Sequence, residues 1–216
     1  MTYFHVLVEG RADEPVVREI LQRRFGLMAE TDFRVHPHRG KGILPAYPNN
    51  RPEPQRQGLL DLLPAKLRAW ADLPEGHVVV VLVDADNDRG ADLKAQLLDM
   101  YQALVKKPSN VLFRMAVEES ESWLIADCHA VKMAYPKAKL QKITPFAPDA
   151  IVGAWERLAE ALGRKPADCN GADKHEWATA IMPHVNLEHP ISPSLRVFVD
   201  GLARYIAGSP SLRLTP

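Results

Sequence analysis

The chain has 216 residues, 46% of them hydrophobic, which suffices for one full domain or for one domain with a helical extension. Acidic and basic residues balance at 27 each, so the overall charge gives no sign of a nucleic-acid partner. Two cysteines are too few for a disulfide framework, and with no leader-like start and no apolar run of about 18 residues, we expect a cytoplasmic protein without a membrane partner.

The N-terminal part alternates strand-like and helix-like patterns. In chain order we expect a buried strand over 3–8, a helix over 13–25, a strand over 33–38, a long loop over 39–58 and a helix over 59–73. The first strand ends at Glu9-Gly10, and Gly26 is a suitable stop for the first helix. Pro64 lies within the second helix and should kink or break it.

The alternation continues with a strand over 77–83, a helix over 91–105, a strand over 110–117 and a turn into a helix over 118–127. Strands that alternate with helices predict an α/β fold with a mostly parallel sheet flanked by helices. The uninterrupted apolar run "VVVVLV" suits the centre of such a sheet, where helices cover both faces. Beyond residue 130 only helices are expected, over 150–163, 173–185 and 193–208. We therefore expect an α/β core over 1–127 and a helical C-terminal extension over 128–216 packed on it.

Acidic residues follow three of the predicted strands. In chain order these acids are Glu9, then Asp84, Asp86 and Asp88, and then Glu118, Glu119 and Glu121. Parallel strands bring their carboxyl ends to one edge of the sheet, where open α/β sheets bind ligands. Crowded carboxylates at such an edge repel one another unless a cation lies among them. Because His and Cys are absent from these positions, the donors favour Mg²⁺, Mn²⁺ or Ca²⁺ over zinc.

Two of these acids can face one ion. Asp84 and Asp86 point the same way if the strand geometry continues that far, since side chains alternate along a strand. Two such ions about 4 Å apart form the clamp used for in-line phosphoryl transfer. Asp88 is better explained as a helix cap or a loop residue, and Glu118 as a solvated residue.

Two other classes of site use closely spaced aspartates. An EF-hand calcium loop is disfavoured, because Gly90 falls one position late and Ala95 stands where the last acidic ligand belongs. The Asp-x-Asp nucleophile of aspartyl-phosphate phosphatases remains open. That motif usually follows the first strand, whereas here it lies in mid-chain after an earlier Glu-Gly pair.

The pairing of "VLVEGRADEPVV" with "VVVVLVDADNDRG" resembles the Toprim domain, which topoisomerases, DnaG-type primases, RecR proteins and OLD-family nucleases share. The block "RMAVEESESWLIAD" is similar to the third acidic block of a widespread bacterial Toprim-like family related to the OLD-family nucleases. "DKHEWATAI" and "SPSLRVFVDGL" resemble its C-terminal helical part. One departure is Ala12, where such proteins more often carry Thr or Ser, and Asp13 can take over that capping role. The resemblance implies a Toprim/Rossmann-like fold.

The resemblance also implies roles for individual residues. Glu9 would be a metal ligand or a general acid or base, and Asp84 and Asp86 would hold Mg²⁺ or Mn²⁺. Glu119 and Glu121 would serve a second ion. Lys174 is the candidate for the lysine that stabilises charge on the phosphorus. Asp88 and Asp13 would be outer-shell or capping residues.

The segment "HPHRGKG" supplies candidate phosphate contacts. Its glycines allow close approach of a backbone to a phosphate, and Arg39 and Lys41 supply the charge. A flexible basic loop without a ligand would have the same composition. The spacing of a Walker A motif is absent, so any use of ATP must come from a partner.

These features predict a divalent-metal-dependent phosphodiester hydrolase acting on DNA or RNA, as the effector of a two-component phage-defence or DNA-repair system. Proteins with this resemblance often stand beside an ABC- or SMC-like ATPase, which is the expected partner. The alternative is a regulatory Toprim module that binds nucleic acid or a partner without catalysis.

Overall fold

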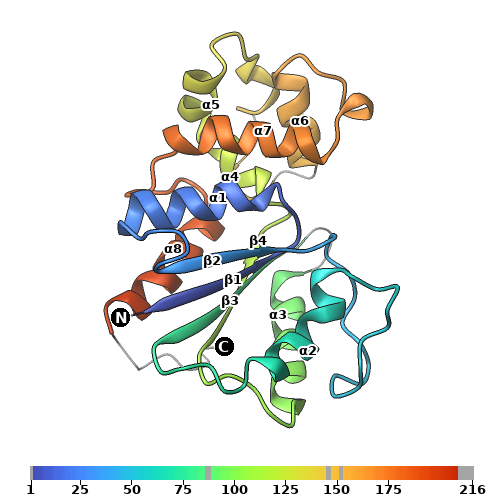
Figure 1. The fold of residues 1–216 in the computed structure, drawn as a ribbon. Coiled ribbons are helices and arrows are strands. Elements are labelled where there is room, and N and C mark those ends of the chain that lie inside the picture. The colour runs from blue at the N-terminus through green and yellow to red at the C-terminus, as the bar shows by residue number, and fades with distance from the viewer. Residues whose placement is uncertain (1, 86–88, 145–146, 151–152, 209–216) are drawn as a thin grey trace.

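The computed structural model describes residues 2–85, 89–144, 147–150 and 153–208. A four-stranded sheet in the order β2-β1-β3-β4 forms its centre (Figure 1). The strands are β1 (Tyr3–Val8), β2 (Phe33–Pro37), β3 (His77–Asp84) and β4 (Val111–Ala116), and every pairing is parallel. The expected α/β class is confirmed.

Helices cover both faces of the sheet, which explains why β3 is apolar along nearly its whole length. Val78, Val80 and Leu82 face one apolar cluster, and Val79, Val81 and Val83 face another. The first face is covered by α1 (Asp13–Glu19), which continues as a π-helical turn over Ile20–Arg24, and by α8 (Pro193–Ile206). The second is covered by α2 (Leu59–Ala69) and α3 (Gly90–Ala103), which lie together beside the sheet in Figure 1.

The remaining helices form a layer beyond α1 (Figure 1). They are α4 (Glu121–Ala126), α5 (Cys128–Ala134), α6 (Ala154–Ala161) and α7 (Gly171–Ile181), joined by short 3₁₀ turns at Leu140–Lys142, Pro166–Asp168 and Met182–His184. The first apolar cluster runs without a break from the sheet into this layer. The division of the chain at residues 127 and 128 stays a prediction.

The break expected at Pro64 does not occur, since α2 runs past it. Pro64 removes one backbone hydrogen bond, but the buried side chains of Leu59, Leu63 and Leu67 hold both ends of the helix against the sheet. Among the described segments, none of the helices combines the length and apolarity needed to cross a bilayer.

Candidate metal centre

Glu9 and Asp84 meet at the carboxyl ends of neighbouring strands. β1 and β3 pair side by side, with Leu7 opposite Val81, so both strands end at the same edge. The backbone N–H of Asp84 donates to Oε1 of Glu9 over 2.8 Å. Two acidic motifs that lie 75 positions apart in sequence are therefore in direct contact.

The Asp84 carboxyl group lies among other acids. Its Oδ1 accepts a hydrogen bond from the backbone N–H of Ser120, at 3.1 Å. Loss of surrounding water and then the nearby charges of Asp13, Glu9, Glu121 and Glu119, in that order, raise the pKa of Asp84 well above its usual range. An ionised Asp84 is thus costly here unless a cation shares the site.

Asp13 lies beneath this edge at the start of α1, where it is 7% exposed. It accepts hydrogen bonds from Gly10 N at 2.9 Å and from Ser120 Oγ at 2.8 Å. Burial raises the pKa of Asp13, while the Ser120 and Gly10 hydrogen bonds oppose that rise. Ser120 therefore ties Asp13 to Asp84, with its hydroxyl on one carboxylate and its amide on the other.

Lys174 lies between the two glutamates of the third acidic block. Its Nζ is 3.5 Å from Glu119 Oε1 and 3.4 Å from Glu121 Oε1. The same ammonium lies 5.0 Å from the centre of the Trp155 ring, a cation–π arrangement. Although burial disfavours the charged form, Glu121 and then Glu119 raise the pKa of Lys174.

The helix α7 positions Lys174 through its first turn. Asn170 caps this helix, since its Oδ1 accepts from Ala172 N at 2.8 Å. Next to Lys174, the Nδ1 atom of His175 forms a 2.9 Å hydrogen bond with the carbonyl of Arg11, in the loop after β1. A residue far along the chain is thereby attached to the loop that carries Glu9.

The side chains of Glu119 and Glu121 are themselves largely shielded from solvent. Glu121 is 4% exposed, and burial raises its pKa against the opposing charge of Lys174. Burial, and then the charge of Glu121, raises the pKa of Glu119 to about 8. Oε2 of Glu119 is buried and has no hydrogen-bond partner within the described part of the chain. Such an oxygen is suited to a cation or a donor that joins the site later.

Glu118 has a different role from the solvated one expected. Its backbone has a φ of 64°, and its side chain reaches the start of α6. Oε1 accepts from Gly153 N at 2.8 Å, and Oε2 accepts from Ala154 N at 3.1 Å. Glu118 thus caps α6 from another element, a contact for which the sequence carries no local signal.

The loop with Arg39 and Lys41 lies over the same edge. Gly40 N donates to the carbonyl of Glu9 at 2.9 Å, and Lys41 Nζ donates to the carbonyl of Ala85 at 3.4 Å. Gly42 adopts a φ of 70°, and a side chain there would collide with Asp61. The Arg39 side chain is exposed. The two predicted phosphate contacts therefore border the acidic edge, with Lys41 the nearer to β3.

The donor chemistry fits a hard divalent cation, although a closed set of ligands is not formed. The acidic side chains at this edge supply carboxylate oxygens, and Glu119 retains a buried oxygen without a partner in the described part of the chain. Within the described ranges, however, no three acidic, His or Cys side chains converge closely enough to hold an ion. Asp86 and Asp88, both predicted to lie at this edge, fall outside the described residues.

Comparisons with known proteins agree with this fold. Two structures of the C-terminal region of the OLD protein of Xanthomonas campestris pv. campestris, phased with iodine and with mercury, are similar to the chain, with TM-scores of 0.51 and 0.50 and identities of 16% and 14%. Each match covers 96% of this chain and 97% of the other. This likeness to the C-terminal region of OLD proteins confirms the predicted α/β fold.

The sequence comparison places the chain in a family. No curated protein matches it in sequence. The model of the family described as "Domain of unknown function (DUF4276)" matches residues 8–203, nearly the whole chain. The chain therefore belongs to the DUF4276 family.

Proposed function

We propose that this chain is a Toprim-type nuclease, a phosphodiester hydrolase that needs Mg²⁺ or Mn²⁺ and acts on DNA or RNA. The contact between Glu9 Oε1 and Asp84 N carries the proposal, because it joins the two motifs on which the Toprim resemblance depends. Glu119, Glu121 and Lys174 lie along the same edge and supply a second acidic pair with a cation. The structural likeness to the OLD C-terminal region supports this proposal at the level of fold.

In this proposal, Glu9, Asp84 and Asp86 would hold one ion, and Glu119 and Glu121 another. A bound divalent ion supplies positive charge to phosphate oxygens and lowers the pKa of water. The ion pairs of Lys174 with Glu119 and Glu121 would weaken once a divalent cation neutralises these carboxylates. The Lys174 ammonium, which has three donor protons, could then donate to a phosphate oxygen. Glu9, whose Oε1 accepts from the backbone N–H of Asp84, would act as the general acid or base.

Substrate backbone contacts would come from the loop over the edge. Lys41, held 3.4 Å from the Ala85 carbonyl, would direct its charge toward a phosphate beside Asp84. Arg39, which is exposed, would contact the next phosphate outward. Asp13, tied to Gly10 and Ser120, would position Glu9 and Asp84 from beneath without touching the substrate.

A cleavage assay tests the proposal. The purified chain is incubated with supercoiled, linear and single-stranded DNA and with RNA, in Mg²⁺, in Mn²⁺ and in EDTA. We expect metal-dependent cleavage that falls at least about 100-fold in Asp84→Ala/Asp86→Ala, as for loss of a main catalytic group. Asp92→Ala/Asp99→Ala makes the same changes on the exposed side of α3 and should retain activity. Equal cleavage by wild type and the Asp84→Ala/Asp86→Ala variant would reject the proposal.

A regulatory module is the second candidate. Its supporting observation is that Lys174 already neutralises Glu119 and Glu121, while no described trio of ligands converges. Calorimetry with Mn²⁺ separates the two candidates. Saturable binding that Asp84→Ala/Asp86→Ala abolishes favours the nuclease, whereas absence of binding in wild type favours the regulatory module.

The partner in either case would be a cytoplasmic ATPase of ABC or SMC type, in a two-component phage-defence or DNA-repair complex. The sequence printed here has no Walker motif, and its fold is similar to the C-terminal region of OLD proteins, so ATP hydrolysis would be supplied by an ATPase. We expect an ATPase gene beside the gene of this chain, and a complex of the two products on gel filtration. A solitary gene would contradict this partnership.

A further inference from the structure

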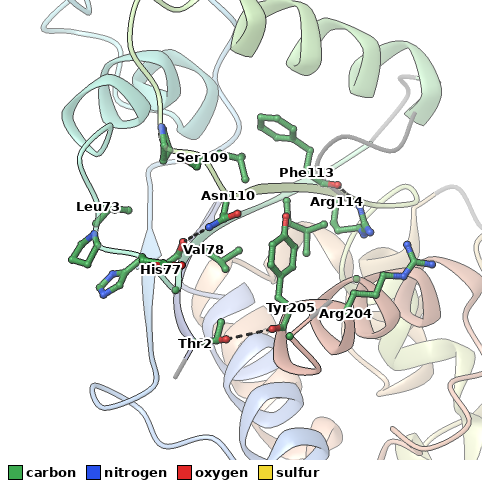
Figure 2. Close-up of a pocket in the computed structure, with 18 of the residues that line it drawn as sticks. Thr2, Leu73, His77, Val78, Ser109, Asn110, Phe113, Arg114, Arg204 and Tyr205 are labelled. Carbon is green, nitrogen blue, oxygen red and sulfur yellow. Dashed lines mark hydrogen bonds between the residues drawn. The ribbon is translucent and has the colours of Figure 1, made fainter. Parts of the chain in front are cut away.

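A groove of about 530 Å³ runs along the outer edge of β4, between α3 and α8. Its floor is the backbone of residues 111–114, and Figure 2 shows Arg114, Arg204 and Tyr205 around it. Leu98 and Pro108 contribute apolar surface. The groove begins at the amino end of β4, opposite the carboxyl edge where Glu9 and Asp84 lie, so a ligand in it would leave that edge open.

The β4 backbone presents a partly open hydrogen-bonding edge to this groove. β4 is the last strand of the sheet in the described part of the chain. Val79 N donates to Asn110 O, and Ala85 N to Ala116 O, so the even-numbered residues of β4 face β3. The odd-numbered residues therefore direct their N–H and C=O groups away from β3. Of these residues, Val111 and Phe113 line the groove, and the Phe113 carbonyl accepts a hydrogen bond from Arg114. The spacing of these groups matches the backbone of an added strand.

Two guanidinium groups, those of Arg114 and Arg204, line the groove together with one carboxylate, that of Glu75. Arg114 donates to the carbonyl of Val197 at 3.1 Å. It also donates to the carbonyl of Phe113 at 2.8 Å (Figure 2). Neither Arg114 nor Arg204 forms an ion pair with any described residue. Burial and then the charge of Arg204 lower the pKa of Arg114, and the charges of Tyr205 and Asp200 oppose that change only in part, so Arg204 and Arg114 repel each other. A negatively charged ligand would relieve that repulsion.

Gly201 holds Arg114 in this position. Glycine is disfavoured within a helix, yet Gly201 stands inside α8. A Cβ atom there would lie 2.6 Å from Nη2 and 2.7 Å from Nε of Arg114. The missing side chain lets the guanidinium lie flat against the helix, where it forms part of the wall of the groove.

From these contacts we infer that the groove binds an extended acidic segment of a partner protein, which adds to β4 as a fifth strand. The strand edge selects a peptide backbone, because its donors and acceptors alternate, and nucleic acid offers no such alternation. The two arginines select acidic side chains. A second copy of β4 would bring like charges together, and residues 209–216 of this chain carry only one charged side chain, Arg213, of the same sign.

Two pools of fluorescent octapeptides test this inference on the full chain. Both have Val, Ile or Thr at alternate positions, with Glu at the others in one pool and Lys in the second. We expect saturable anisotropy changes with the Glu pool, at least tenfold tighter than with the Lys pool. Arg204→Glu should weaken this binding at least tenfold, whereas Lys137→Glu, the same change at an exposed site on the helical layer, should not.

A second variant tests the backbone edge. Val111→Pro removes an N–H that faces the groove and leaves the β3 ladder intact, and proline is tolerated as the first residue of an edge strand. It should weaken Glu-pool binding without changing the circular dichroism spectrum. Four results would each overturn the inference. The two peptide pools could bind equally well, or peptide could bind only after deletion of residues 209–216. The protein could form a dimer that Val111→Pro dissociates, or it could bind single-stranded DNA but not peptide, with that DNA binding abolished by Arg204→Glu.

Discussion

Lys174 Nζ lies 3.4 Å from Oε1 of Glu121, and Glu121 is almost completely buried. Removal of one member of a buried ion pair leaves the other charge without compensation, which costs about 3–5 kcal/mol. Lys174→Ala should therefore lower the free energy of unfolding by about 3 kcal/mol. The measurement is urea denaturation at pH 8 in EDTA.

The cost of Lys174→Ala should shrink at pH 5, because a protonated Glu121 needs no counter-charge. Lys142→Ala is the matched control, since it breaks the exposed pair between Lys142 and Glu160, 3.2 Å apart. Such pairs contribute at most about 1 kcal/mol. Equal losses in the two variants would show that the Lys174 pair adds no more than a surface contact.

Asp84→Asn should make the metal-free protein more stable while it abolishes stabilisation by metal. Because the folded state raises the pKa of Asp84, its ionisation lowers stability as pH rises above the unfolded value of 3.8. Asparagine keeps an oxygen for the Ser120 amide and carries no charge, so a gain of about 0.5–2 kcal/mol at pH 7 is expected.

Thermal melts of Asp84→Asn in EDTA and in Mn²⁺ check both halves of this prediction. Wild type should gain several degrees with Mn²⁺, and Asp84→Asn should gain none. Asp92→Asn, an exposed position on α3, serves as the control and should behave as wild type. A variant that is less stable than wild type in EDTA would contradict the repulsion at this edge.

Ser120→Ala should destabilise the fold more than Ser122→Ala. The Ser120 hydroxyl donates to the buried carboxyl group of Asp13, whereas the Ser122 hydroxyl donates to the carbonyl of Val117 at 3.1 Å. Hydrogen bonds to charged groups contribute about 1.5–3 kcal/mol, and neutral ones about 0.5–1.5 kcal/mol. The Asp13 pKa, followed by carbon NMR, should also rise in Ser120→Ala, because that hydrogen bond lowers it.

Acid should weaken the fold through a cluster of histidines, His5 on β1, His36 on β2 and His77 at the start of β3. Burial lowers the pKa of His5 and of His36 to about 4, with the charges of His77 and Lys66 as the next causes respectively. The unfolded chain takes up these protons near pH 6.5. Stability is therefore complete above 6.5 and is lost as the pH falls from 6.5 to 4.

His36→Phe should reduce this loss, because Phe keeps the ring packing against His5 and Trp70 and cannot ionise. Between pH 6.5 and 4.5, the Tm of wild type should fall by at least about 2 °C more than that of the variant. His129→Phe, at an exposed position, should retain the wild-type slope. Parallel pH profiles of wild type and His36→Phe would show that His36 does not control acid sensitivity.

The sheet was predictable from the sequence because a strand that is buried on both faces consists of a continuous run of apolar residues. The six buried residues of β3 are all apolar, Asp84 is the last residue of that strand, and Glu9 directly follows β1. Parallel pairing then places these two acids at one edge. Glu119 and Glu121 likewise follow a predicted strand, but their assignment to a second ion and the choice of Lys174 needed the family resemblance.

Only the tertiary structure decided which hydrogen-bond donors the acidic side chains contact. Glu118 caps α6, and Ser120 joins Asp13 to Asp84 with two different groups, across separations that no local pattern records. The groove beside β4 is likewise a product of packing, in which Arg114 lies against Gly201 of a distant helix. Buried apolar residues recur with the period of the strand or helix, so their pattern can be recognised in the sequence. A hydrogen bond between distant side chains depends on how those elements pack, so the sequence alone does not specify it.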